Sequence, residues 1–113
     1  MTARGSAYGA VGVDPLRVLQ EFSARVRAEL RTEDLIARWG GEEFALALPC
    51  CAREDAQQIL GHLASLLPHG QTFSAGHTIH RGGEALPTCF DRADANLYRA
   101  KGEGKNRVVT DPD

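Results

Sequence analysis

Apolar residues recur at spacings of three and four in three stretches of the chain, which predicts three amphipathic helices. The first helix is expected to begin with Asp14 as its N-cap and Pro15 at its first helical position. Its apolar stripe is formed by Leu16, Leu19, Phe22, Val26 and Leu30. A second helix is predicted from residue 53 to the proline at 68, and a third over residues 90–101, before the glycines at 102 and 104.

Four shorter stretches predict strands. Residues 35–39 and 43–48 lie on either side of two glycines, an arrangement typical of a β-hairpin. A third strand is predicted over residues 72–80, where Gly76 should weaken the strand or mark a bulge, and a short edge strand over 106–109. This order of helices and strands indicates an α+β fold, similar to an α/β sandwich, with a mostly antiparallel sheet flanked by helices.

The length and the composition describe one ordinary globular domain. The chain has 113 residues, of which 42% are hydrophobic and 25% charged, so it has room for a single core. Residues 1–13 are rich in Gly, Ala and Ser without periodicity, which predicts an irregular lead-in to a domain over residues 14–113. The net charge of −2 argues against DNA as a partner, because DNA binding needs a basic surface.

The same composition bears on the compartment. No apolar run reaches the length of a membrane span, and the first residues lack the pattern of a signal peptide, so we expect a cytoplasmic protein with no membrane insertion by this chain. Cys50, Cys51 and Cys89 are an odd number without metal-ligand spacing. We interpret them as reduced, small hydrophobic residues, with zinc binding as a remote alternative.

Candidate chemistry is concentrated at the bend of the predicted hairpin. Gly40 and Gly41 remove the Cβ penalty for a tight turn and allow a ligand to lie against the backbone. Glu42 and Glu43 follow at once, and two adjacent carboxylates are more acid than a solvated turn requires. Hard carboxylate oxygens suit Mg²⁺, so the bend is a candidate metal and phosphate site.

Two charged pairs lie elsewhere in the chain. Lys101 and Lys105 are four residues apart and should share a helix face that could bind a polyphosphate, although cations near a helix C-terminus are also expected for dipole reasons alone. Arg31 and Asp34 would ordinarily be an exposed ion pair that contributes little stability. They precede the strand that leads to the glycines, so at about 3.3 Å per residue they should lie roughly 17 Å from the bend.

Several ordered segments resemble the GGDEF family of diguanylate cyclases. The matching segments are Arg31-x-x-Asp34, residues 34–44 with Arg38-Trp39-Gly40-Gly41-Glu42-Glu43-Phe44, residues 74–76, residues 92–101 and residues 104–107. A glycine pair followed by acids is weak evidence alone, but these ordered blocks together are specific. The resemblance implies a nucleotidyl-cyclase or palm-like fold and an enzyme that condenses two GTP molecules into cyclic di-GMP, each subunit of a homodimer supplying half of the site.

The resemblance also implies roles for individual residues. Glu42 and Glu43 would serve the metal, Mg²⁺ or Mn²⁺, and the attacking 3′-hydroxyl, while Gly40 and Gly41 would lie against the nucleotide. The terminal phosphates would be held by Lys101 and Lys105, with lysine at 105 replacing the arginine often found there. Arg31 and Asp34 resemble the family's inhibitory product site for cyclic di-GMP. Family members usually carry an upstream sensory domain, and this bacterial second messenger acts in signalling.

One part of the family pattern has no counterpart in this sequence. A complete domain begins with a central strand that carries a metal-binding aspartate, and we expect this chain to lack that N-terminal part, leaving an exposed sheet edge. The chain alone is therefore predicted to turn over GTP weakly or not at all. Two alternatives remain open: a non-catalytic cyclic di-GMP receptor that uses Arg31 and Asp34, and an oligomerisation module that uses the exposed edge.

Overall fold

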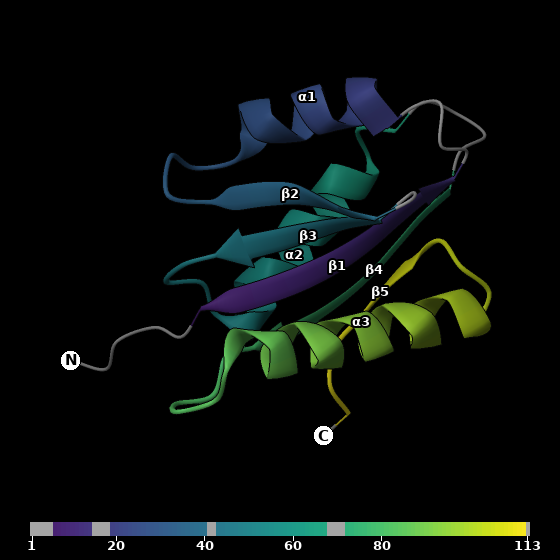
Figure 1. Cartoon of the computed structure of the whole chain (residues 1–113). Helices are drawn as coiled ribbons and strands as arrows, with labels where there is room; N and C mark the ends of the chain where they lie inside the picture. Colours follow the sequence, from purple (N-terminus) through teal and green to yellow (C-terminus); the bar gives the residue numbers. More distant parts are fainter. Residues whose placement is uncertain (1–5, 15–18, 41–42, 68–71, 113) are drawn as a thin grey trace.

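The computed structural model describes residues 6–14, 19–40, 43–67 and 72–112. Eight elements follow one another along this part of the chain (Figure 1). In order, they are β1 (Ala7–Asp14), α1 (Leu19–Glu29), β2 (Leu35–Gly40), β3 (Glu43–Leu48), α2 (Arg53–Ala64), β4 (Thr72–Ile79), α3 (Leu86–Gly102) and β5 (Arg107–Val109). The three predicted helices and the four predicted strands are thus all present, and one further strand precedes them.

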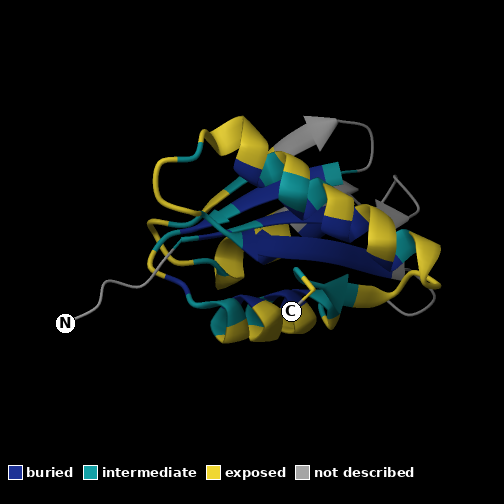
Figure 2. Ribbon diagram, turned by 90° about the horizontal axis from the view of Figure 1, so that it is seen from below, coloured by how far each residue is buried: buried dark blue, intermediate teal, exposed yellow. Residues whose placement is uncertain are grey.

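The five strands form one sheet in the order β2-β3-β1-β4-β5. Every neighbouring pair is antiparallel except β4 and β5, which are parallel, so the predicted mostly antiparallel sheet is confirmed. Helices α1 and α2 cover one face of the sheet and α3 covers the other (Figure 1). The strands are therefore largely buried between the helices, whose outer faces are exposed (Figure 2).

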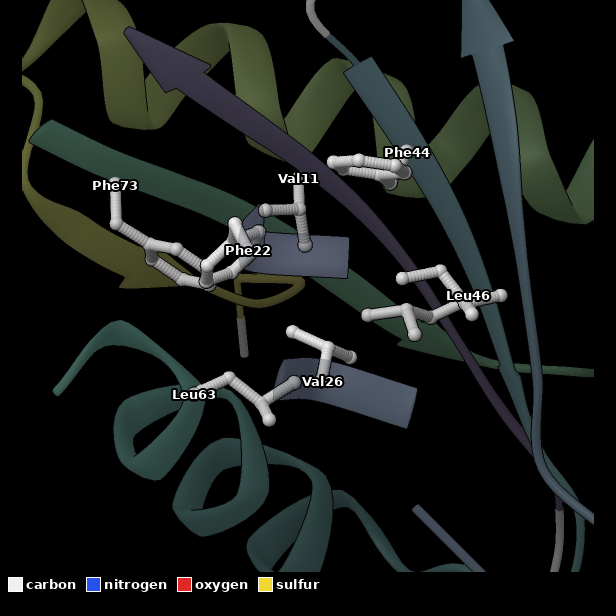
Figure 3. A pocket seen from close by; sticks show the side chains of 8 residues that line it. Val11, Phe22, Val26, Phe44, Leu46, Leu63 and Phe73 are labelled. Carbon is white, nitrogen blue, oxygen red and sulfur yellow. The ribbon is translucent and has the colours of Figure 1, made fainter. Parts of the chain in front are cut away.

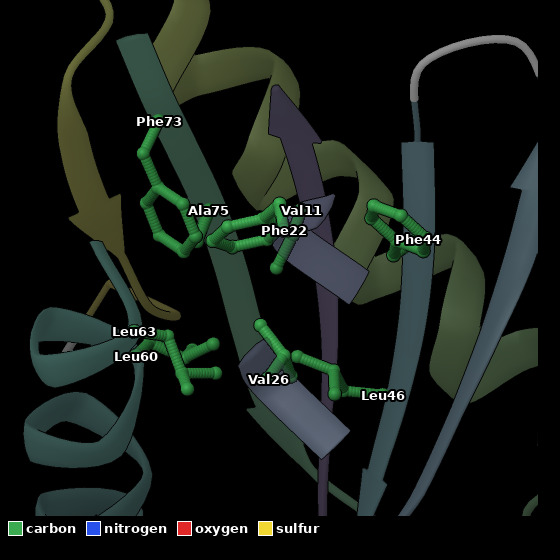
Figure 4. Packing of buried hydrophobic residues seen from close by; sticks show 9 residues of the cluster. All are labelled: Val11, Phe22, Val26, Phe44, Leu46, Leu60, Leu63, Phe73 and Ala75. Carbon is green, nitrogen blue, oxygen red and sulfur yellow. The ribbon is translucent and has the colours of Figure 1, made fainter. Parts of the chain in front are cut away.

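The main core lies between the sheet and the helices α1 and α2. Phe22 of α1 packs against Phe44 and Phe73 of the sheet, with ring centroids 6.2 and 5.8 Å away (Figure 4). Val26 and Leu63 complete the contact between the two helices and the sheet (Figure 3). The gap lined by these apolar side chains has no room for a water molecule, so it is packed core and not a ligand site.

The first strand corrects two expectations. Residues 1–13 were predicted to be irregular, but residues 7–14 form the central strand β1. The helix cap predicted at Asp14 and Pro15 involves residues 15–18, which lie outside the described residues, so it stays a prediction. Small residues have low intrinsic strand propensity, but β1 pairs with β3 on one side and with β4 on the other, which satisfies its backbone groups. The expected loss of the central strand, with an exposed edge in its place, is therefore wrong.

Gly76 has a different role from the one predicted. Strand β4 pairs with β1 without a shift in register from Thr72 to Ile79, so Gly76 marks no bulge. A Cβ at this position would lie 2.1 Å from the backbone nitrogen of Leu97 in α3. Gly76 therefore lets α3 approach the sheet closely, which fixes the helix that carries Lys101.

Candidate functional site

The bend of the β2–β3 hairpin is only partly described. Strands β2 and β3 pair in antiparallel register, with Gly40 opposite Glu43 and an irregularity between Arg38 and Gly40. The hairpin predicted from the sequence is thus confirmed. Gly41 and Glu42 lie outside the described residues, so their predicted roles stay predictions.

Glu43 is paired with a lysine that is distant in the sequence. Its Oε1 accepts a hydrogen bond from Nζ of Lys101, 58 residues away on α3, at 3.3 Å. The two side chains are 27% and 31% exposed, so both remain accessible to a ligand. The structure thereby joins two of the clusters that the sequence shows separately, the hairpin bend and the basic end of the last helix.

Gly12 makes room for the contact between Glu43 and Lys101. The role of this glycine was not predicted from the sequence. Gly12 of β1 lies opposite Glu43 in the sheet register. A Cβ at Gly12 would lie 3.0 Å from Cε and 3.3 Å from Nζ of Lys101, so a larger residue would displace the lysine side chain. The signal that could have found it is a glycine within a strand, where close approach of another group is a common reason for its presence.

The two lysines do not share a helix face, contrary to the prediction. Helix α3 ends at Gly102, and Lys105 lies in the turn that leads to β5. This turn has three successive residues in the left-handed region, Gly104 (φ 118°), Lys105 (φ 63°) and Asn106 (φ 50°). The backbone nitrogen of Lys105 donates to the carbonyl of Ala100 at 2.9 Å, which closes the end of the helix. The side chain of Lys105 is exposed beyond it.

Arg31 and Asp34 form a tight local pair at the other end of β2. Nη2 and Nε of Arg31 donate to Oδ1 and Oδ2 of Asp34 at 2.8 and 3.2 Å, and the backbone nitrogen of Arg31 donates to Oδ2 at 2.9 Å. Nη2 also donates to the carbonyl of Pro49 at 2.6 Å. The hydrogen bonds to Asp34 raise the pKa of Arg31. The Asp34 side chain is only 2% exposed, whereas that of Arg31 is 43% exposed.

A hollow of about 380 Å³ opens beside this pair. It lies between the end of α1 and the start of β2 and is lined by Arg27, Leu30, Arg31, Thr32, Asp34, Leu35 and Ile36. Since β2 begins at Leu35 and ends at Gly40, this hollow and the hairpin bend lie at opposite ends of one strand, as the sequence predicted.

A third polar cluster ties the end of the chain to α3 and β4. Arg92 pairs with Glu84 through Nη1 and Nη2 at 2.9 and 2.7 Å, and this hydrogen bonding lowers the pKa of Glu84 to about 2. Asp111 accepts hydrogen bonds from Thr78 at 2.6 Å and from Asn96 at 2.8 Å. None of these contacts was predicted from the sequence. They hold α3 in place, because Arg92 and Asn96 lie on this helix, which also carries Lys101.

Within the described ranges, no group of three His, Cys, Asp or Glu side chains is arranged to hold a metal ion. Mg²⁺ usually takes only one or two protein carboxylates together with substrate phosphates and water. The partly exposed carboxylate of Glu43 fits that mode of binding, with Lys101 beside it to meet a phosphate. In the same part of the chain, no helix is long and apolar enough to cross a membrane.

The sheet order, the helices on both faces and the charged hairpin end define a palm-like α+β domain of the nucleotidyl-cyclase class. The family profile described as "Diguanylate cyclase, GGDEF domain" matches residues 6–107. The chain therefore belongs to the GGDEF domain family.

Individual relatives agree with this assignment. Diguanylate cyclase DgcP of Pseudomonas aeruginosa is 39% identical over 102 residues, covering 81% of this chain and 15% of its own length. Diguanylate cyclase DgcM of Escherichia coli K12 is 41% identical over 99 residues, covering 81% of this chain and 24% of its own length. The chain thus spans between about a seventh and a quarter of these relatives.

A solved structure of a similar domain has been determined in an interaction with bis-(3′,5′)-cyclic di-GMP. This microbial GGDEF domain is 28% identical in sequence and superposes with a TM-score of 0.86, covering 96% of this chain and 78% of that one. The family profile matches from residue 6 onward, so the matched region includes β1 as well as the hairpin.

Proposed function

We propose that this domain binds GTP and contributes half of a diguanylate cyclase site, in which two GTP molecules are condensed into cyclic di-GMP. The observation that carries the proposal is the ion pair between Glu43 and Lys101, which places a carboxylate and an ammonium group side by side at the hairpin end of a GGDEF-family sheet. A nucleoside triphosphate with its divalent cation offers the complementary charges, the cation to the carboxylate and a phosphate to the lysine.

In this proposal each residue has a stated task. The carboxylate oxygens of Glu43 and Glu42 would hold Mg²⁺ or Mn²⁺ and accept the proton of the attacking 3′-hydroxyl. The ammonium groups of Lys101 and Lys105 hold the terminal phosphates as pyrophosphate leaves. A divalent cation held there would supply charge neutralisation at the α-phosphate. The backbone of Gly40 and Gly41 leaves space for the nucleotide.

We further propose that turnover by this chain alone is weak or absent. Strand β1 occupies the central position next to β3, but it has no carboxylate from Ala7 to Val13, and Gly12 is the residue opposite Glu43. The strand therefore adds no acidic ligand beside Glu43 at that register position. A homodimer, in which each subunit supplies one nucleotide, an upstream sensory domain and a cytoplasmic location stay predictions.

The proposal is tested with the purified chain, Mg²⁺ and GTP. Cyclic di-GMP is measured by liquid chromatography, and binding of a non-hydrolysable GTP analogue is measured by calorimetry. We expect the analogue to bind and little or no cyclic di-GMP to form. Robust turnover would contradict the weak activity proposed, and failure of the analogue to bind would remove the nucleotide site.

A second candidate function is a cyclic di-GMP receptor. The hollow beside Arg31 and Asp34 favours it, since it is open, lies away from the hairpin bend and contains a guanidinium already held in place. Calorimetry with cyclic di-GMP on the wild type and on Arg31→Ala tests this role, and equal affinity of the two proteins would exclude it. The oligomerisation module loses its basis, because β1 fills the position of the edge on which it depended.

A further inference from the structure

The turn between α3 and β5 has a backbone conformation that a helix end alone does not need. A helix commonly ends with one residue in the left-handed region, usually glycine, and Gly104 meets that need. Lys105 and Asn106 then continue in the left-handed region, at φ 63° and 50°. Asparagine tolerates this region, but lysine adopts it rarely, because its Cβ is crowded there. Lysine is therefore an unfavourable choice at position 105 for the fold alone.

The neighbouring structure holds Lys105 in this conformation from several sides. Its backbone nitrogen donates to the carbonyl of Ala100 at 2.9 Å, and its carbonyl accepts a hydrogen bond from Nε of Arg107 at 3.1 Å. The backbone nitrogen of the next residue, Asn106, donates to Oγ of Ser74 at 3.3 Å. Ser74 belongs to β4 and is only 4% exposed, so this hydrogen bond ties the turn to the interior of the domain.

The side chain of Lys105 takes no part in this network. It is exposed, and its ammonium group has no hydrogen-bond or ion-pair partner among the described residues. Left-handed backbone at a residue other than glycine is maintained by surrounding contacts and clusters at functional sites. The turn also lies near the hairpin end, because Gly12 of β1 pairs with Glu43 on one side and with Ser74 on the other. Glu43 and Ser74 are thus two strand spacings apart, about 10 Å.

We infer that Ser74 is a positioning residue, whose hydroxyl fixes the turn after α3 so that Lys105 presents its ammonium group to the terminal phosphate of a nucleoside triphosphate. The inference rests on the phosphate contact proposed above for Lys105 and names the residue through which the fold maintains that contact. A lysine on a turn that is already fixed loses less conformational freedom on binding than one on a loose turn. The competing explanation is that the hydroxyl of Ser74 only stabilises the fold.

Calorimetry on the full chain with Mg²⁺ separates these explanations. The ratio of the affinities for a non-hydrolysable GTP analogue and for GDP isolates the terminal phosphate, because both ligands contain the base, the sugar and the first two phosphates. Ser74→Ala should lower this ratio roughly two- to tenfold, the range for one net hydrogen bond. If Ser74→Ala binds the GTP analogue with the ratio of the wild type, the inference is wrong and the proposed function stands.

Thr78→Ala is the matched control. It also removes a buried hydroxyl from β4, but this hydroxyl donates to Asp111 and not to the turn. Its loss should therefore lower stability and leave the affinity ratio unchanged. A ratio that falls equally in Thr78→Ala and Ser74→Ala would assign the effect to general destabilisation and contradict a positioning role.

A double variant tests whether Ser74 acts through Lys105. Lys105→Ala should lower the affinity ratio more than Ser74→Ala does, because it removes the phosphate contact itself. Adding Ser74→Ala to Lys105→Ala should then cause no further loss, since residues that act through one contact are not additive. A further loss in the double variant would show that Ser74 acts independently of Lys105, and the inference would be wrong.

Hydrogen exchange followed by nuclear magnetic resonance gives a measurement that needs no nucleotide. The backbone amide of Asn106 should exchange faster in Ser74→Ala than in the wild type and in Thr78→Ala, because its acceptor is gone. Unchanged protection would show that Ser74 does not fix the turn, whatever the nucleotide affinities are. If the turn loosens as expected but the wild type does not bind the GTP analogue, the inference fails together with the proposed function.

Discussion

The two ion pairs at opposite ends of β2 differ in almost every respect. Glu43 and Lys101 come from distant parts of the chain, make one contact of 3.3 Å and are both about one-third exposed. Arg31 and Asp34 are three residues apart and share several short hydrogen bonds, with the carboxylate buried beneath the guanidinium. A ligand can separate the first pair at little cost in free energy. The second pair is preorganised, and separating it costs more.

This difference assigns different tasks to the two ends of the strand. A loose pair is suited to a site through which substrate passes, because a phosphate can replace the carboxylate beside Lys101 and a cation can replace the lysine beside Glu43. A tight pair is suited to a site that recognises a ligand by shape, because its guanidinium is held in one orientation. Breaking the pair of Glu43 and Lys101 should therefore mainly affect ligand binding, whereas breaking the pair of Arg31 and Asp34 should mainly affect stability.

The largest effect is expected at the loose pair when ligand binding is measured. Lys101→Ala should reduce the affinity for a non-hydrolysable GTP analogue roughly ten- to a hundredfold, because a charge-assisted contact to phosphate is lost. Lys101→Arg keeps the charge and should retain most of the affinity. Calorimetry in the presence of Mg²⁺ measures both variants. Unchanged affinity in the alanine variant would show that Lys101 does not contact the nucleotide.

At the tight pair the largest effect should be on folding. Asp34→Ala leaves the backbone nitrogen of Arg31 and part of its guanidinium without their acceptor, and it should lower the free energy of unfolding by about 1 to 3 kcal/mol. Asp34→Asn keeps an acceptor oxygen and should cost less. Urea unfolding followed by circular dichroism measures the difference. An Asp34→Ala protein as stable as the wild type would show that the pair is not held as tightly as its geometry indicates.

The pair of Glu84 and Arg92 lies between these two extremes and can be examined by pH. Its hydrogen bonds lower the pKa of Glu84 to about 2 from an ordinary value near 4.5. A depressed pKa in the folded state means that the stabilisation is fully present above about pH 4.5 and is lost as the pH falls towards 2. Glu84→Gln should therefore be less stable than the wild type at pH 7, and the difference should shrink at pH 2.5. Urea midpoints at the two pH values check this, and a constant difference would contradict it.

The same comparison explains what the sequence could predict. Arg31 and Asp34 are neighbours in the chain, so their pairing and their distance from the hairpin followed from local spacing. The contact between Glu43 and Lys101 depends on how close α3 lies to the sheet, and that in turn depends on Gly76 and Gly12. The residue that each glycine accommodates cannot be identified from the sequence, because it is 20 or more residues away in another element.

The error about residues 1–13 has a related cause. β1 contains two glycines, Gly9 and Gly12, and two alanines, a composition that suggests irregular structure when each residue is judged by its own propensity. Its strand conformation comes from pairing on both sides, with β3 and with β4. Where neighbours supply all the hydrogen bonds, tertiary context decides the structure and local propensity does not.

The smallest expected effect is the direct coupling between Glu43 and Lys101. Both side chains are partly exposed and solvent screens their attraction, so a double-mutant cycle of Glu43→Gln, Lys101→Met and the double variant should give a coupling of less than about 1 kcal/mol in unfolding experiments. The coupling should fall further in high salt. A coupling well above that range would place this pair with Arg31 and Asp34 as a structural element, and substrate would then have to break it. If a phosphate is to replace the carboxylate beside Lys101, the coupling should be small and the loss of nucleotide affinity in Lys101→Ala should be large.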